Sequence, residues 1–207
     1  MSTKKINRPR NTAKIEFVER KSVFIGFSTF VENEEQALEI IKQKKKEYSD
    51  ATHNVYAYVI GETIARYSDD NEPQGTAGMP VLNSIRMSGI TDVLVVVTRY
   101  FGGILLGAGG LVRAYSTAAS MALEEGGIKV YEQYNSYKLK ISYSDYGKIN
   151  TELTSVDAII DNVEFADEVT IDYAIKADIS ENFEKRIIDL FAGRVAPQFI
   201  AVRIDTK

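Results

Sequence analysis

The sequence predicts an α+β protein made of two domains. From residue 137 onward, apolar and polar residues alternate in short segments separated by helical ones, in the order βαββαβ. Residues 93–98 are almost all apolar and β-branched, as in a strand covered on both faces. Residues 1–130 hold 16 Lys and Arg against 15 Asp and Glu, whereas residues 131–207 hold 9 against 14. We therefore expect domains at 1–130 and 131–207, with residues 1–12 as a flexible basic tail.

The first domain is expected to be an α/β sandwich. Asn33 is a helix N-cap with Gln36 at the capping-box position, and Pro80 suits the start of a later helix. The expected elements in order are strands at 14–19 and 22–31, a helix at 33–48, strands at 54–60 and 62–67, a helix at 80–87, a strand at 93–98 and a helix at 111–125.

The second domain is expected to be ferredoxin-like, with two helices packed on a four-stranded antiparallel sheet. Ser180, followed by acidic residues, is read as the N-cap of its second helix. The expected elements are a strand at 137–143, a helix at 146–154, strands at 158–165 and 168–176, a helix at 181–191 and a strand at 198–204.

Composition excludes several kinds of chemistry. The chain has no cysteine, which rules out disulfide-linked partners, thiolate metal sites and cysteine nucleophiles. No segment approaches the roughly 18 continuous apolar residues of a membrane helix, and the polar N-terminus has no apolar stretch behind it. A cytoplasmic protein without a membrane partner is expected. Basic residues near the N-terminus and at 42–46 suit either an RNA contact or a solvated surface.

A glycine-rich run follows the strand at 93–98. It reads Arg99-Tyr100-Phe101-Gly102-Gly103-Ile104-Leu105-Leu106-Gly107-Ala108-Gly109-Gly110-Leu111. Val112 replaces the last glycine of a dinucleotide fingerprint, and Ala108-Gly109 replaces the Lys-Ser/Thr pair of a P-loop. Free amides at a helix N-terminus nevertheless suit an anion, and Arg99 and Arg113 would add charge. The alternative is that the glycines serve only positive φ angles and close packing.

An acidic loop precedes the helix at 80–87. Asp69, Asp70 and Glu72 supply oxygen ligands of the kind that Mg²⁺ takes, but the same residues also make Asx turns, with Asn71 in a left-handed conformation. His53, the only histidine, is either a general base or a structural residue. No complete catalytic set is visible, so no catalytic residue, metal or cofactor is assigned.

Three segments together resemble the IMPACT family, including its bacterial YigZ members. They are Ala51-Thr52-His53-Asn54, the loop Glu72-Pro73-Gln74-Gly75-Thr76-Ala77-Gly78-Met79-Pro80, and the run from Arg99 through Gly110-Leu111-Val112-Arg113-Ala114-Tyr115-Ser116. The match extends over about residues 13–127, and Asn71 and Gln74 depart from the usual pattern. The resemblance implies that the first domain shares the fold of a ribosomal protein domain and of elongation factor G domain IV, and the second that of its domain V.

The resulting hypothesis is a non-enzymatic protein associated with translation regulation or the stress response. It would bind RNA, a ribosomal surface or a translation-related protein through a glycine-rich cleft. One alternative is a small hydrolase or phosphate-handling enzyme that uses the acidic loop, and another is a protein-interaction adaptor. The candidate cleft residues are His53, Asp69, Asp70, Glu72, Gly75, Thr76, Arg99, Tyr100, Phe101, Gly102, Gly103, Gly107, Gly109, Gly110, Arg113 and Tyr115.

Overall fold

The computed structural model describes residues 5–206 and has a mixed α and β architecture with antiparallel sheets. The chain divides into two compact units, one formed by Ile6–Val130 and the other beginning at Tyr131. In the described part of the chain, no helix is long and apolar enough to cross a membrane. The two units are described separately below.

The first unit is built on a five-stranded antiparallel sheet in the order β2-β3-β6-β4-β5. The central strand β6 is buried at every position except its last residue, Tyr100, which confirms the expectation of a strand covered on both faces. The bounds are β2 Ala13–Glu19, β3 Ser22–Phe30, β4 His53–Ile60, β5 Ile64–Ser68 and β6 Val93–Tyr100.

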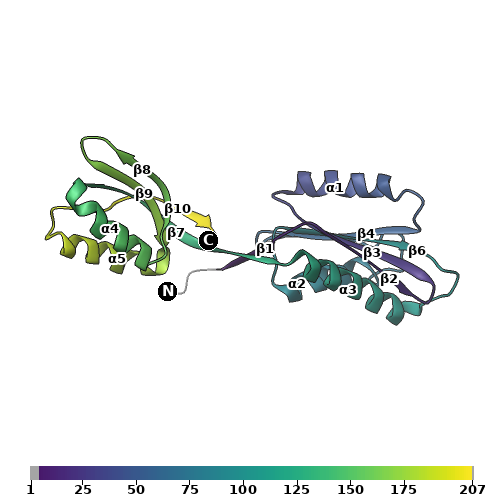
Figure 1. The fold of residues 1–207 in the computed structure, drawn as a ribbon. Helices are drawn as coiled ribbons and strands as arrows, with labels where there is room; N and C mark the ends of the chain where they lie inside the picture. Colours follow the sequence, from purple (N-terminus) through teal and green to yellow (C-terminus); the bar gives the residue numbers. More distant parts are fainter. Residues whose placement is uncertain (1–4, 207) are drawn as a thin grey trace. The chain divides into compact units, whose positions relative to one another are not determined.

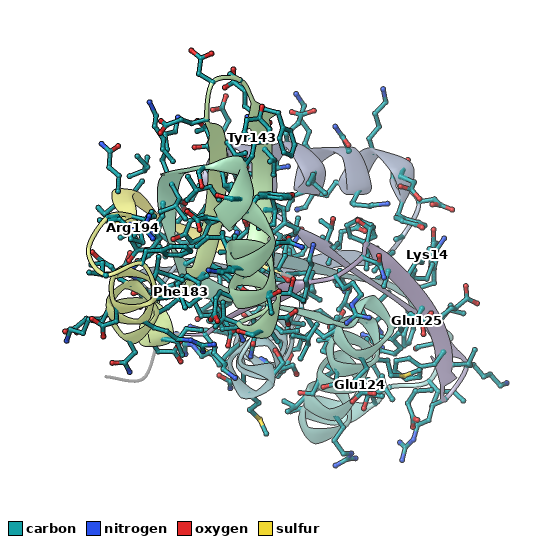
Figure 2. All side chains as sticks on the ribbon, turned by 60° about the vertical axis from the view of Figure 1, so that its left-hand side comes forward. Lys14, Glu124, Glu125, Tyr143, Phe183 and Arg194 are labelled. Carbon is teal, nitrogen blue, oxygen red and sulfur yellow. The ribbon has the colours of Figure 1, made fainter. Side chains whose placement is uncertain are left out.

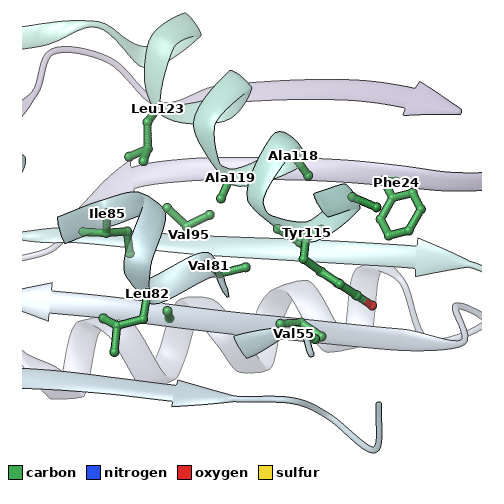
Figure 3. Close-up of a cluster of buried hydrophobic side chains, with 14 of the residues drawn as sticks. Phe24, Val55, Val81, Leu82, Ile85, Val95, Tyr115, Ala118, Ala119 and Leu123 are labelled. Carbon is green, nitrogen blue, oxygen red and sulfur yellow. The ribbon is translucent and has the colours of Figure 1, made fainter. Parts of the chain in front are cut away.

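Helices cover both faces of this sheet (Figure 1). Helix α1 (Glu34–Glu47) lies on one face, and helices α2 (Gly78–Ser88) and α3 (Gly107–Gly126) lie on the other. Because successive side chains of a strand point to opposite faces, Leu94 and Val96 belong to the core under α1, while Val95 and its odd-numbered neighbours belong to the larger core under α2 and α3. Figure 3 shows that larger core, where Tyr115 reaches from α3 across the sheet beside Phe24.

The N-cap predicted for α1 is confirmed. Asn33 accepts a hydrogen bond from the amide of Gln36 at 2.9 Å. In return, the side-chain oxygen of Gln36 accepts a hydrogen bond from the amide of Glu32, one residue before the cap, at 2.7 Å. Helix α2 begins at Gly78, so Pro80 lies inside its first turn, where a missing amide costs no helical hydrogen bond.

The expectation of a flexible tail at residues 1–12 is wrong for residues 6–12. Residues 1–4 lie outside the residues that the structure describes. Ile6–Pro9 form strand β1. The Asn7 carbonyl accepts from the amide of Thr91 at 2.9 Å, and Arg8 binds Asp92 at 2.7 Å. The Asn11 amide donates to Gly126 at 3.0 Å. These bonds to residues distant in the sequence hold residues 6–11 in place. The basic charge of the segment gives no sign of them.

The second unit has the predicted βαββαβ order, with the antiparallel arrangement β10-β7-β9-β8. This strand order, with two helices sharing one core with the sheet, is that of a ferredoxin-like domain. The bounds are β7 Ile128–Ile141, α4 Tyr143–Ser155, β8 Ile159–Phe165, β9 Val169–Lys176, α5 Ala177–Leu190 and β10 Gln198–Asp205.

Hydrogen bonds tie both helices of this unit to other elements. Tyr143, at the start of α4, donates to the carbonyl of Ala166 in the turn between β8 and β9 at 2.7 Å (Figure 2). Ser180 is not the N-cap of α5, because that helix begins three residues earlier. Its hydroxyl donates to the carbonyl of Ala177 at 2.9 Å and accepts from Asn135 at 2.8 Å, so it joins the helix to β7.

Candidate functional site

The acidic loop between β5 and α2 does not gather its carboxylates around one point. Asp69 accepts hydrogen bonds from the amides of Gly75, Ala77 and Gly78, at 2.9, 3.1 and 2.7 Å. It therefore closes the loop and satisfies amides at the N-terminus of α2, where a negative charge is favoured.

Asp70 performs a second structural task in the same loop. Its carboxylate accepts from the amide of Asn54 at 2.6 Å and from Lys45 at 2.5 Å. Asp70 and Asn71 have φ angles of 44° and 67°, so the left-handed conformation predicted for Asn71 is confirmed. The carbonyl of Asp70 lies 2.7 Å from Nδ1 of His53, which fixes the ring of that histidine.

Glu72 is the centre of a buried polar cluster. Its side chain is 3% exposed, and its Oε1 accepts from Arg99 at 2.6 Å and from the Tyr115 hydroxyl at 2.7 Å. Nε2 of His53 lies 3.7 Å from the same oxygen. Burial and the Glu72 carboxylate raise the pKa of Tyr115 far above its usual value, so its hydroxyl remains a donor. The cluster joins the acidic loop to β4, β6 and α3.

Arg99 does not lie on an open surface as an anion-binding cation. Its side chain is 6% exposed, is neutralised by Glu72, and lies between the rings of Phe24 and Phe101 at 5.6 and 5.4 Å. A weaker hydrogen bond joins it to the Ser22 hydroxyl at 3.4 Å, and its Nε is buried without a partner. The predicted direct contact between Arg99 and phosphate is therefore incompatible with this geometry.

The glycine-rich run divides between a loop and a helix. Residues 101–106 form the loop, and α3 begins at Gly107, so Gly109 and Gly110 belong to the first helical turn and not to the connection. A side chain at Gly102 would meet the backbone carbon and oxygen of Lys21 at 2.0 Å. Close packing therefore explains that glycine, while positive φ angles of 81° and 74° explain Gly103 and Gly107.

A pocket of about 430 Å³ opens beside this cluster. Five of the predicted residues line it: His53, Glu72, Arg99, Phe101 and Gly107. Sequence reasoning did not select its other lining residues, which are Thr52, Asn71, Pro73, Leu105, Leu106, Ala108 and Leu111. Leu105 is 81% exposed, and the apolar triplet at 104–106 within a glycine-rich loop was the available signal of a contact surface.

The remaining predicted residues lie outside this pocket. Arg113 is exposed and lines a separate hollow of about 310 Å³ with Arg20, Leu106 and Gly110. Tyr100 donates to Asp50 at 2.9 Å. The buried Thr76 donates to the carbonyl of Pro73 at 2.6 Å. Asp69, Asp70, Gly75, Thr76, Tyr100, Gly102, Gly103, Gly109, Gly110 and Tyr115 position the site or its surroundings without lining the pocket.

This combination defines a two-unit α+β protein with a pocket above a buried Arg-Glu pair. Residues 20–123 match the family model of the Impact N-terminal domain, and residues 139–194 match a domain of unknown function, DUF1949. The chain belongs to the IMPACT family.

Bacterial relatives extend this similarity over most of the chain. It is 36% identical to the Bacillus subtilis protein "IMPACT family member YvyE", with 86% of this chain and 83% of that protein covered. It is 32% identical to Escherichia coli "IMPACT family member YigZ", with 88% and 91% covered. A solved structure described as a hypothetical protein has 30% identity and a TM-score of 0.61, with 95% of this chain and 98% of that chain covered.

Proposed function

We propose that this protein is a translation-associated regulator that binds single-stranded RNA through the first unit. The observation that carries the proposal is a group of exposed cations beside the N-terminal turn of α3. Arg20 and Arg113 line one hollow, and Lys21 follows Arg20 in the turn whose backbone packs against Gly102. None of the three forms a salt bridge with another described residue, so their charge is available to phosphate.

The helix terminus adds to this positive potential. Leu106 precedes α3 without a side-chain cap, and the first turn contains no acidic residue. The helix itself therefore supplies no carboxylate to its own terminal amides, an arrangement that favours anions, and Glu19 is, among the described residues, the one acidic residue that lines the hollow with Arg20 and Arg113. The exposed ring of Phe101, 45% accessible, supplies a face on which an unpaired base can stack.

The link to translation comes from the family. The expected likeness of the two domains to domains IV and V of elongation factor G favours an RNA or ribosomal partner. Relatives from Xenopus tropicalis and Danio rerio carry the names Protein IMPACT-B and Protein IMPACT. Those two matches cover 36% of each relative, so their roles are not transferred as a whole. A cytoplasmic location and a ribosomal surface as the source of the RNA belong to the same proposal.

Binding of a fluorescent 12-nucleotide RNA, measured by anisotropy at several salt concentrations, tests this function. We expect Arg113→Ala to weaken binding and to reduce the slope of log affinity against log salt by about one, because one phosphate contact is lost. Arg86→Ala is the matched control, since Arg86 is exposed on α2 of the same unit and lines neither hollow. Absence of salt-sensitive RNA binding by the unmodified protein contradicts the proposal.

A protein-interaction adaptor is the second candidate, because Leu105 and Ile104 expose apolar surface beside the pocket. Such an interface would respond weakly to salt. The hydrolase alternative loses its structural support: the loop carboxylates are engaged by separate amides and cations, and no group of three possible metal ligands occurs among the described residues.

A further inference from the structure

The floor of the 430 Å³ pocket contains a carboxylate oxygen that is free to accept a hydrogen bond. Every hydrogen bond to Glu72 ends on Oε1, and within residues 5–206 no group donates to Oε2. Fully buried polar atoms without a hydrogen-bond partner occur elsewhere in this part of the chain, but Oε2 of Glu72 is not one of them. It therefore keeps contact with solvent in the pocket that Glu72 lines. A side chain that is 97% buried thus keeps one strong acceptor in the lining of the pocket.

The His53 ring lies next to this carboxylate. Nδ1 lies 2.7 Å from the carbonyl oxygen of Asp70, and because a carbonyl only accepts, Nδ1 carries the proton. Nε2 lies 3.7 Å from Oε1 of Glu72. The edge of the His53 ring and the Glu72 carboxylate therefore lie side by side at the polar end of the pocket.

The electrostatics favour a neutral donor over a cation. Arg99 already neutralises Glu72 at 2.6 Å, and a second full positive charge on the same carboxylate would be repelled by the guanidinium. The remaining walls are mostly apolar and include Pro73, Leu111 and the exposed ring of Phe101, while Thr52 and Asn71 add two polar side chains. The volume lies in the range of small-ligand pockets, and the walls suit a flat ring.

We infer that this pocket receives one unpaired nucleobase of the bound RNA and prefers guanine. This inference rests on the proposed RNA-binding function and specifies the base that the site selects. Guanine offers adjacent N1–H and N2–H donors to the Glu72 carboxylate, while its face packs against Phe101. Uracil presents two carbonyl oxygens around its single N–H, and these would meet the Glu72 carboxylate unfavourably.

The test compares three 12-nucleotide RNAs at one salt concentration. Each is oligouridine, with uridine, inosine or guanosine at the sixth position. The guanosine RNA should bind roughly three- to tenfold more tightly than all-uridine RNA, because additional hydrogen bonds form. Inosine keeps N1–H but lacks the N2 amino group, so its affinity should lie between the other two.

Variants separate the pocket from the phosphate contacts. Phe101→Ala should abolish most of the guanosine preference, whereas Phe165→Ala, which removes an exposed phenylalanine in the other unit, should preserve it. Glu72→Gln should also remove the preference because its amide can place a donor where Oε2 accepted, and circular dichroism checks that this buried variant folds. Arg113→Ala should weaken all three RNAs equally and leave their ratios unchanged.

The outcomes distinguish the two proposals. Equal affinities for the three RNAs, or a guanosine preference that survives Phe101→Ala, overturn the base pocket while the RNA-binding function stands. Absence of binding to all three RNAs overturns both.

Discussion

Gly102 illustrates how one residue couples two loops of the site. The position has no room for a methyl group, because the backbone of Lys21 lies 2.0 Å from the place of a Cβ atom. The amide of Gly102 also donates to Ser22 at 3.1 Å, and the same hydroxyl accepts from Arg99. The β2-β3 turn and the glycine-rich loop are therefore held against each other.

We expect Gly102→Ala to lower the free energy of unfolding by about 1–3 kcal/mol or more, since backbone must shift to admit the methyl group. Gly109→Ala is the matched control: the nearest atom to its Cβ is the end of Arg113 at 3.7 Å, and alanine favours a helix. Urea denaturation checks both variants. Equal stability of the two proteins would contradict the close-packing explanation.

Tyr58 provides a prediction about alkaline pH. Burial, followed by its hydrogen bond to Glu34, raises the pKa of Tyr58 to about 12 from its ordinary value of 10.0. The folded protein holds this proton more tightly than the unfolded chain, so the stabilisation is complete below pH 10.0 and is lost as the pH rises toward 12. We expect a loss of about 2 kcal/mol from this residue over that interval, by the conversion of pKa shifts into free energy.

Urea titrations at several pH values measure this effect, with Tyr58→Phe as the comparison. The variant should lose stability less steeply with pH, although it should be less stable at neutral pH because Glu34 loses a donor. An identical pH dependence of the two proteins would exclude Tyr58 as the source.

At the scale of elements, the beginning of α2 depends on a residue far outside that helix. Asp69 binds three amides around the helix start, although it lies nine residues before Gly78. We expect Asp69→Ala to destabilise the protein by about 1–2 kcal/mol or more, the usual effect of losing a helix cap. Asp69→Asn keeps an acceptor oxygen but loses the charge, so its effect should be smaller.

Thermal or urea unfolding followed by circular dichroism measures these two variants. Glu39→Ala is a control on α1, where the exposed carboxylate has, among residues 5–206, a hydrogen bond only with Gln43 of its own helix. A destabilisation by Asp69→Ala no larger than that of Glu39→Ala would show that the cap does not stabilise the fold.

Elements with strong local signals were predictable from the sequence, and their ends were less so. The strand at 93–98 and the Asn33 cap are confirmed because β-branched runs and N-cap side chains act over a few residues. The starts of α3 and α5 were placed too late, at 111 and 181, because glycine and serine were read as boundaries. In α5 the Ser180 hydroxyl bonds to Ala177 and Asn135 instead of capping the helix.

The candidate site was predictable in composition but not in arrangement. The His53, Glu72 and Arg99 segments were recognised as one cleft, and the structure brings these three residues to one pocket. Their roles differ from the expectation, because Arg99 is buried against Glu72 instead of facing an anion. Burial of a charge depends on which distant residue pairs with it, and sequence spacing does not encode that partner.

At the scale of the molecule, the two compact units have separate hydrophobic cores with no buried residue in common. We propose that they are domains that unfold separately, with the boundary near residue 130. Leu153→Ala should destabilise the second unit by about 2–5 kcal/mol, because Leu153 is 2% exposed within its core.

Native-state amide hydrogen exchange tests this separation. Protection should fall in β9 and remain unchanged in β6, whereas Leu190→Ala, at an exposed position of the same unit, should affect neither strongly. An equal loss of protection in β6 and β9 would mean that the chain unfolds as one cooperative unit.

The sequence by itself determined the order of the strands and helices that follow β1, the α+β class and the segments from which the pocket is built. These follow from periodicity, capping and glycine placement, which act between near neighbours. Only the tertiary structure decided that Arg99 is neutralised by Glu72, that Arg113 faces a different hollow, and that Oε2 of Glu72 stays free. The physical reason is that burial and charge pairing are set by residues tens of positions apart, brought together only when the sheet and its helices pack.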